Sequence, residues 1–196
     1  MKILAKYTKA IDRVSELFGA ISMYIVIITF IVGFLNVVLR YTGELVGRKL
    51  TNNVFIELQW YLYSLIFFFS FSYILKNGIN VRVDFWFAEQ NKKLQAKIDL
   101  VGHFIALIPF CVLALWATWT PVLRSWGLRP NGEWGTWELS PDPNGLPRAP
   151  IKSMIVIAFT LLLLQGIAEI IKLIAILRDQ EHLVQTVDRD APIRIE

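Results

Sequence analysis

A polar face near the end of the sequence has the most regular spacing of any residues that could do chemistry. Gln165, Glu169 and Lys172 recur at i, i+4 and i+7, so they share one face of a helix. Glu169 and Lys172 can pair along that helix, which predicts either a polar seam facing a partner helix or a helix end whose charges neutralise each other. Asn36, near the end of an earlier apolar run, has two possible roles as well: it either forms a hydrogen bond to a neighbouring helix or simply lies in the membrane interface.

Catalytic and cofactor chemistry would need residues that this chain does not contain. His103 is the one histidine within an apolar run, whereas a haem held between helices usually takes two imidazoles. Beside the small residue Gly102, it is expected to be a hydrogen-bonded packing residue. The single Cys111 allows no disulfide within the chain, and there is neither a nucleophile with its base nor a glycine-rich phosphate loop. The sequence therefore predicts no enzyme, no cofactor and no metal.

Four apolar runs must position these residues. Hydrophobic residues make up 55% of the 196 and charged residues 18%, which is too apolar for a soluble domain. Each run approaches or exceeds the roughly 20 residues that cross a bilayer. The runs are 17–39, 58–75, 100–122 and about 151–176. We predict an all-α membrane protein with a domain of four transmembrane helices over residues 1–177 and a polar cytoplasmic tail, 178–196.

Lysine and arginine are distributed unevenly around these runs. Thirteen lie in the N-terminal tail, the second connection and the C-terminal end, and seven lie in or beside the first and third connections. Because cytoplasmic segments carry the excess of basic residues, both termini are expected to be cytoplasmic. No basic face suited to nucleic acid is visible, and the net charge is only +4.

A charged patch follows the second run, which Glu57 opens. The patch is Lys76-Asn77-Gly78-Ile79-Asn80-Val81-Arg82-Val83-Asp84. From Val83 onward, apolar residues fall on one helical stripe. This stripe predicts an amphipathic interfacial helix between the second and third spans, with Asp84 able to cap its start. The alternative is an extension of the third transmembrane helix.

The third connection, residues 124–150, differs in composition from the other two. Its prolines and glycines exclude long regular elements. Trp126, Trp134 and Trp137 give it enough apolar area to fold back on the membrane interface or to dock an extracytoplasmic partner. Both interpretations place this connection at the outer surface of the membrane.

Short motifs at the span ends resemble, in their order and spacing, those of a known family. They are Asn36-Val37-Val38-Leu39-Arg40-Tyr41, Glu57-Leu58, Gly78-Ile79-Asn80-Val81-Arg82-Val83-Asp84, Leu146-Pro147-Arg148-Ala149-Pro150-Ile151-Lys152 and Leu164-Gln165-Gly166. The family is the DctQ-like small membrane subunit of TRAP (tripartite ATP-independent periplasmic) transporters, and the likeness covers roughly residues 10 to 177. Asn80 departs from the family's frequent histidine, and because asparagine takes up no proton near neutral pH, no titrating role is expected there.

The resemblance implies a multi-pass, non-catalytic subunit of a bacterial or archaeal inner (plasma) membrane. It would scaffold a large multi-span subunit that carries the substrate and sodium sites, for sodium-driven uptake of an organic acid delivered by a periplasmic binding protein. Membrane lipids would be its other partners, and no nucleic acid is expected. The candidate subunit-contact or orienting residues are Asn36, Arg40, Glu57, Arg82, Asp84, Gln165, Glu169 and Lys172.

Two other functions are compatible with such a chain. One is the membrane anchor subunit of a redox enzyme, which the lack of a second intramembrane histidine disfavours. The other is a self-sufficient small carrier that oligomerises, for which Glu169 would be the residue to test. The candidate residues likewise have alternative roles as interfacial anchors and helix caps.

Overall fold

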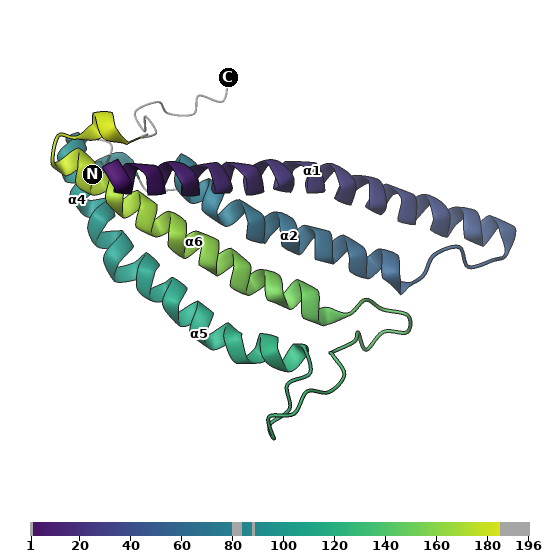
Figure 1. Ribbon diagram of the computed structural model, residues 1–196. Helices are drawn as coiled ribbons and strands as arrows, with labels where there is room; N and C mark the ends of the chain where they lie inside the picture. Colours follow the sequence, from purple (N-terminus) through teal and green to yellow (C-terminus); the bar gives the residue numbers. More distant parts are fainter. Residues whose placement is uncertain (1, 80–83, 88, 185–196) are drawn as a thin grey trace. The chain divides into compact units, whose positions relative to one another are not determined.

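Helices make up most of the structure. The computed structural model describes residues 2–79, 84–87 and 89–184. Its α-helices in chain order (Figure 1) are α1 (Lys2–Val46), α2 (Asn53–Asn77), α3 (Asp84–Phe87), α4 (Lys92–Gly102), α5 (Ile108–Ser125) and α6 (Arg148–Leu177). A π-helical turn, His103–Leu107, joins α4 to α5, and a short 3-10 turn, Glu181–Leu183, follows α6.

Four helical stretches in the described ranges are long and apolar enough to cross a membrane. They are Ile3–Val46, Asn53–Asn77, Lys92–Ser125 and Arg148–Leu177. The prediction of an all-α protein with four transmembrane helices is therefore confirmed. The first and third stretches begin earlier than the apolar runs that predicted them, because polar turns extend both helices at their N-terminal ends.

Two glycines end the first two long helices in the same way. Gly47 follows α1 with φ 68° and Gly78 follows α2 with φ 65°, a left-handed conformation that glycine adopts without steric cost. The Arg48 N–H then donates to the Gly43 carbonyl at 2.9 Å, and the equivalent bond closes α2 at 3.2 Å. Each helix thus ends in a Schellman motif, which fixes the direction in which the next connection leaves.

The amphipathic stretch between the second and third spans is divided in two. Helix α3 covers four residues, and Asn91 then starts a new helix by accepting a hydrogen bond from the Leu94 N–H at 2.8 Å. From Lys92 the chain stays helical through the π-turn to Ser125. The predicted single interfacial helix is not confirmed, and the part after Asn91 extends the third span, as the alternative interpretation had it.

Two compact units make up the chain, and each combines segments of several helices. Unit 1 consists of Met1–Phe18, Phe71–Leu113 and Phe159–Glu196. Unit 2 consists of Gly19–Ser70 and Ala114–Ala158. Unit 1 therefore contains the start of α1, the end of α2 and the end of α6, whereas unit 2 contains the connections that follow α1 and α5.

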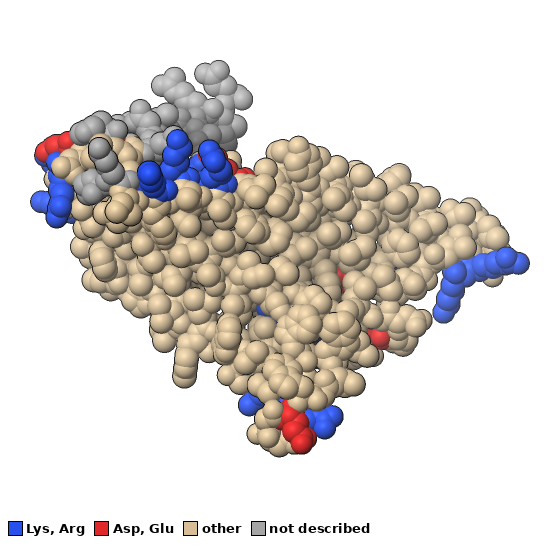
Figure 2. All heavy atoms as spheres, viewed as in Figure 1, with Lys and Arg blue, Asp and Glu red and all other residues tan. Residues whose placement is uncertain are grey.

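Small side chains are among the most deeply buried in both units. Ala168 and Ala175 in unit 1, and Ala149 and Ala158 in unit 2, are completely buried, which lets helices approach closely. Many large apolar side chains face outward instead, and Trp116 is 78% exposed. In Figure 2 the surface of the spans is almost entirely tan, with blue and red side chains gathered where helices end. Such an apolar exterior suits lipid or another membrane protein.

Candidate functional site

A buried polar network joins α1 and α6 within unit 1. Lys172 Nζ donates to Asp12 Oδ1 at 2.7 Å and to Glu169 Oε1 at 2.8 Å. Gln165 Nε2 donates to the same two oxygens at 2.9 and 3.0 Å, and Ser15 Oγ donates to Gln165 Oε1 at 2.8 Å. The three charged side chains are at most 4% exposed. Two carboxylates therefore share one ammonium and one amide where water screens little.

This network occupies the polar face that the sequence indicated on α6. The three α6 residues do share a face, and that face meets α1 of the same chain. Sequence reasoning misses Asp12 and Ser15, because the apolar run begins only at residue 17 and leaves both in the N-terminal tail. The available signal is the spacing of Thr8, Asp12 and Ser15 on one helical face, and all three are buried. The role of the α6 residues as subunit contacts stays a prediction.

Ion pairs fix further helix ends of unit 1. Lys76, in the last turn of α2, pairs with Glu16 of α1, and the Lys76 side chain is only 10% exposed. Lys92 and Lys93, at the start of α4, pair with acids that follow α6, at 2.7 and 2.8 Å. Because these last pairs are well exposed, they stabilise less than the pair at Lys76.

His103 lies in the π-turn and is buried. Its Nδ1 donates to the Asp99 carbonyl at 2.6 Å, and within the described part of the chain its Nε2 has no hydrogen-bond partner. Gly166 of α6 packs on the same turn, since a Cβ there would lie 2.9 Å from Leu107 Cδ2. This is the environment of a hydrogen-bonded packing residue, as the sequence predicts.

Glu57 holds the third connection against α2 within unit 2. The residue is only 2% exposed, and its carboxylate accepts hydrogen bonds from the Ser140 hydroxyl and the Leu146 N–H. A Cβ at Gly145 would lie 2.7 Å from Glu57 Oε2, so glycine is needed for this close approach. These contacts fix residues 140–147 on the first turns of α2.

A second carboxylate, Glu138, fixes the same connection. It accepts a hydrogen bond from Ser125 Oγ at 2.8 Å and forms an ion pair with Lys152. The Lys152 ammonium first, and then the Ser125 hydroxyl, hold the pKa of the Glu138 carboxyl below its ordinary value. The backbone is tied here too, since the Glu138 N–H donates to the Ser125 carbonyl at 2.7 Å. The connection therefore follows a defined path although it is rich in proline and glycine.

The tryptophans of the third connection are partly exposed. Trp126 Nε1 donates to Ser153 Oγ at 2.7 Å, and its ring centroid lies 5.8 Å from that of Trp137. Trp134 is 64% exposed. In the ranges that the structure describes, an isolated bridge between Leu128 and Trp134 is the only β-type pairing, as expected for this composition. The docking of an extracytoplasmic partner on these rings stays a prediction.

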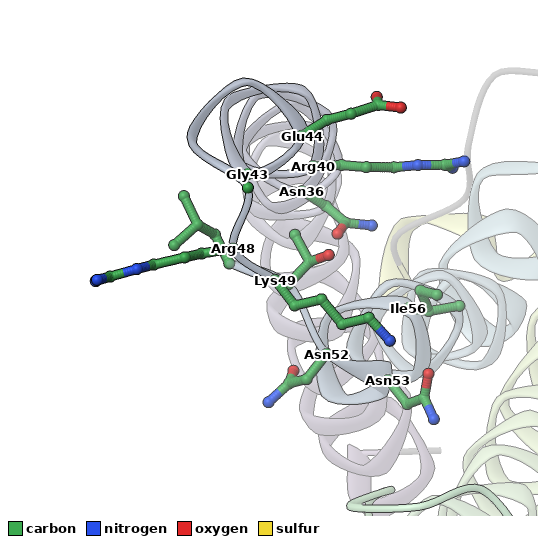
Figure 3. Close-up of a pocket in the computed structure, with 12 residues that line it drawn as sticks. Asn36, Arg40, Gly43, Glu44, Arg48, Lys49, Asn52, Asn53 and Ile56 are labelled. Carbon is green, nitrogen blue, oxygen red and sulfur yellow. The ribbon is translucent and has the colours of Figure 1, made fainter.

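The first connection forms a pocket with the ends of α1 and α2, within unit 2 (Figure 3). The pocket has a volume of about 570 Å³, and Asn36 and Arg40 both line it. Asn36 Nδ2 also donates to Gln59 Oε1 at 3.4 Å, a long contact between α1 and α2. Gly43 lets the chain cross α1 here, because a Cβ would lie 2.5 Å from the Arg48 carbonyl oxygen.

The remaining predicted residues lie in the second connection. Asn80 and Arg82 are outside the described residues. Asp84 begins α3, and because its side chain is not among those described, its capping role stays a prediction. The structure thus brings the three α6 residues together and places Asn36 and Arg40 in one pocket. Glu57 belongs to neither group and contacts the third connection instead.

The chemistry of these sites is that of holding helices in place. The carboxylates in the buried network and beside the third connection receive donors from their own chain. Within the described ranges, no group of three or more His, Cys, Asp or Glu residues could hold a metal ion. The contacts of these sites orient helices and connections.

Comparison with known proteins adds a family to this geometry. Residues 29–176, more than half of the chain, match the family described as "Tripartite ATP-independent periplasmic transporters, DctQ component". Comparisons with curated proteins and with solved structures gave no match. The matched region contains α2 to α5, the last part of α1 from residue 29 on, and nearly all of α6, and so all four spans contribute to it. The chain belongs to the DctQ family and is a multi-pass inner-membrane protein, the small permease subunit of a tripartite ATP-independent periplasmic transporter.

Proposed function

We propose that the chain is the non-catalytic scaffold of its transporter. It pairs with a large multi-span membrane subunit that carries the substrate and sodium sites. A periplasmic binding protein delivers an organic acid to this pair for sodium-driven uptake. Membership of the DctQ family supports the transporter assignment. The observation that supports a scaffold role is that buried charges of the spans have partners within the chain.

The buried network of α1 and α6 illustrates this point. Each carboxylate accepts hydrogen bonds from both Lys172 and Gln165, and the ammonium has two acceptors. Removing one partner of such a buried pair costs about 3–5 kcal/mol. A satisfied network therefore holds two helices rigidly together, which suits a subunit that stays fixed while a transport domain moves against it.

The outward apolar side chains supply the contact surface for the large subunit. Phe30 on α1 is 75% exposed and Trp116 on α5 is 78% exposed. Helices associate in a bilayer through side-chain packing and interhelical hydrogen bonds, so partner helices are expected to cover part of this surface. Arg40, Arg82 and Asp84 remain our candidates for orienting the pair, because Arg40 lies in the last two turns of the first span and the other two follow the second span in sequence.

The two other functions considered have no comparable support. The family match describes a transporter component, which gives no support to a redox-enzyme anchor. A self-sufficient carrier would need Glu169 to change partners during transport, but its carboxylate is held by Lys172 and Gln165 in the buried network.

Reconstituted uptake tests the proposal. Proteoliposomes would contain the chain alone, the large subunit alone, or both, with an imposed sodium gradient and the binding protein loaded with a labelled organic acid. We expect the two membrane proteins to co-purify and uptake to require both, with a potassium gradient as the control. Uptake by the chain alone, or two membrane proteins that do not associate, would contradict the scaffold role.

A further inference from the structure

The pocket formed by the first connection holds cations that none of the contacts above uses. Arg40, Arg48 and Lys49 line it and are exposed. Among the described residues, none of the three has a side-chain hydrogen bond or an ion pair. By contrast, Lys152 in the same unit is paired with Glu138. Unpaired cations around a hollow are suited to receiving an anion.

Two of these cations face the same part of the pocket. In Figure 3, Arg40 and Lys49 extend toward the side where Ile56 lies, whereas Arg48 points away. Glu44 is the acid among the lining residues, so this part of the pocket carries a formal charge of about +1 at neutral pH. Helix α2 begins at Asn53 beside it, and the dipole of that helix adds positive potential.

Neutral polar groups complete the lining. Asn36, Asn52 and Asn53 bring amides that donate and accept hydrogen bonds, and Glu44 brings a further acceptor. A phosphodiester carries one negative charge and takes hydrogen bonds from donors, while hydroxyls on an attached polyol need acceptors. The pocket offers both kinds of group, and its volume of about 570 Å³ lies in the range of small-molecule sites.

The rim of the pocket is apolar and lies at the end of a span. Leu50 and Ile56, which line the pocket, are 43% and 56% exposed, and Leu45 and Val46, which lie between the lining residues Glu44 and Gly47 in sequence, are 88% and 62% exposed. Cations beside exposed apolar side chains are typical of the boundary between lipid headgroups and acyl chains. A soluble anion would use the cations and leave the apolar rim uncovered, whereas a phospholipid would use both.

We propose that this pocket binds the headgroup of phosphatidylglycerol. The phosphate lies between Arg40 and Lys49, and the glycerol hydroxyls donate to Glu44 and to the amide oxygens of the asparagines. The single negative charge of this lipid balances the charge of the pocket, whereas a zwitterionic headgroup leaves it unbalanced. The site is independent of the proposed transport role, because it needs neither the large subunit nor a solute.

Lipid binding to the full-length chain tests this site directly. The purified protein in detergent is titrated with phosphatidylglycerol or with phosphatidylcholine, and bound lipid is counted by native mass spectrometry. The test variant is Arg40→Gln with Lys49→Gln. The control variant, Arg124→Gln with Arg178→Gln, removes two exposed arginines at other span ends. Gel filtration and circular dichroism establish that each variant is folded, and Lys49→Arg tests whether charge at that position is sufficient.

We expect the wild-type chain to prefer phosphatidylglycerol. Because each basic residue near an anionic headgroup strengthens binding about fivefold, the test variant, which lacks two of them, should lose roughly 25-fold in affinity. The control variant and Lys49→Arg should each stay within about threefold of wild type. Equal binding of phosphatidylglycerol by the wild type and the test variant would overturn the proposal.

Two further arms identify the source of the anion. Glycerol 3-phosphate and inorganic phosphate are each added at millimolar concentration. If either binds alone, and does so only when Arg40 and Lys49 are present, a soluble phosphate compound occupies the pocket and the lipid assignment is overturned. Pull-down of the periplasmic binding protein is the last arm. A test variant that loses that protein while keeping wild-type lipid binding would also overturn the proposal and make the pocket a protein-docking site.

Discussion

The buried network of unit 1 and the pocket of unit 2 use similar charged residues in opposite ways. In the network, Lys172 has two carboxylate partners and is 4% exposed on its side chain. In the pocket, Arg40 and Lys49 are exposed and, within the described ranges, unpaired. A buried charge is costly unless it is paired, whereas a charge at a span end keeps its contact with water and headgroups. The network therefore holds the chain together, and the pocket is free to bind something else.

The largest expected effect is on reporter fusions, which show on which side of the membrane each region lies. The excess of lysine and arginine predicts that both termini and the second connection are cytoplasmic, which would put the network at the inner surface and the pocket at the outer surface. A reporter that is active only after export should be active when fused after Trp137 and inactive when fused after Lys93. If the fusion after Lys93 were active and the one after Trp137 inactive, the predicted sides of the network and of the pocket would both be reversed.

Neutralising the buried Lys172 should lower the free energy of unfolding far more than neutralising the exposed Arg40. Lys172→Met leaves Asp12 and Glu169 buried without their ammonium, and should lower the free energy of unfolding by about 3–5 kcal/mol. Arg40→Met removes an exposed charge, and should change it by about 0.5 kcal/mol or less. Denaturant titration in detergent micelles, followed by circular dichroism, measures both. Similar losses for the two variants would mean that the pocket cation is also structural.

A comparison of two glutamates within unit 2 should give a smaller, local effect. Glu57→Gln weakens the hydrogen bonds to Ser140 and Leu146, whereas Glu44→Gln changes an exposed residue of the pocket. Because Glu57 fixes residues 140–147, limited proteolysis should cut the third connection roughly tenfold faster in Glu57→Gln. Glu44→Gln should be cut at the wild-type rate. Equal rates for both variants would show that Glu57 does not hold this connection.

The fold could be predicted from the sequence because a bilayer sets a simple length requirement. Four apolar runs of sufficient length, separated by charged or proline-rich segments, are enough to predict four spanning helices. Helix starts were harder to place. The part of α1 before the apolar run and the start of α4 carry little hydrophobic signal, and tertiary contacts such as the Asp12–Lys172 and Lys92–Glu181 pairs support them instead.

The candidate site could be predicted only within single helices. The spacing of Gln165, Glu169 and Lys172 shows that they share a face, but their partner Asp12 lies 160 residues before Lys172. The pairing of Glu57 with Ser140, 83 residues apart, is equally nonlocal. The prolines of the third connection indicate which elements cannot form there. The path of that connection is set by Glu57 and Glu138, which periodicity does not reveal.

The smallest expected effect is on the pH at which the third connection loosens. The pocket, in the same unit, should not show this pH dependence. Lys152 and Ser125 lower the pKa of Glu138 in the folded chain, so the folded value lies below the ordinary 4.5. A lowered folded pKa means that the stabilisation is present above the ordinary value and is lost as the pH falls through the folded value. Lys152→Gln removes the larger cause, so the connection should loosen at a higher pH, closer to 4.5.

Tryptophan emission recorded from pH 6 to pH 3 measures this loosening, since the Trp126 and Trp137 rings contact each other at a tilted angle, Trp137 directly precedes Glu138, and Trp126 follows its partner Ser125. Trp137→Phe identifies the part of the signal that arises there, and Arg124→Gln controls for the loss of a nearby positive charge. The midpoint should rise in Lys152→Gln and stay unchanged in Arg124→Gln. A midpoint that moves equally in both variants would mean that general electrostatics, and not the Glu138–Lys152 pair, sets the acid stability of this connection. The difference between the paired Lys152 and the unpaired cations of the pocket would then matter less.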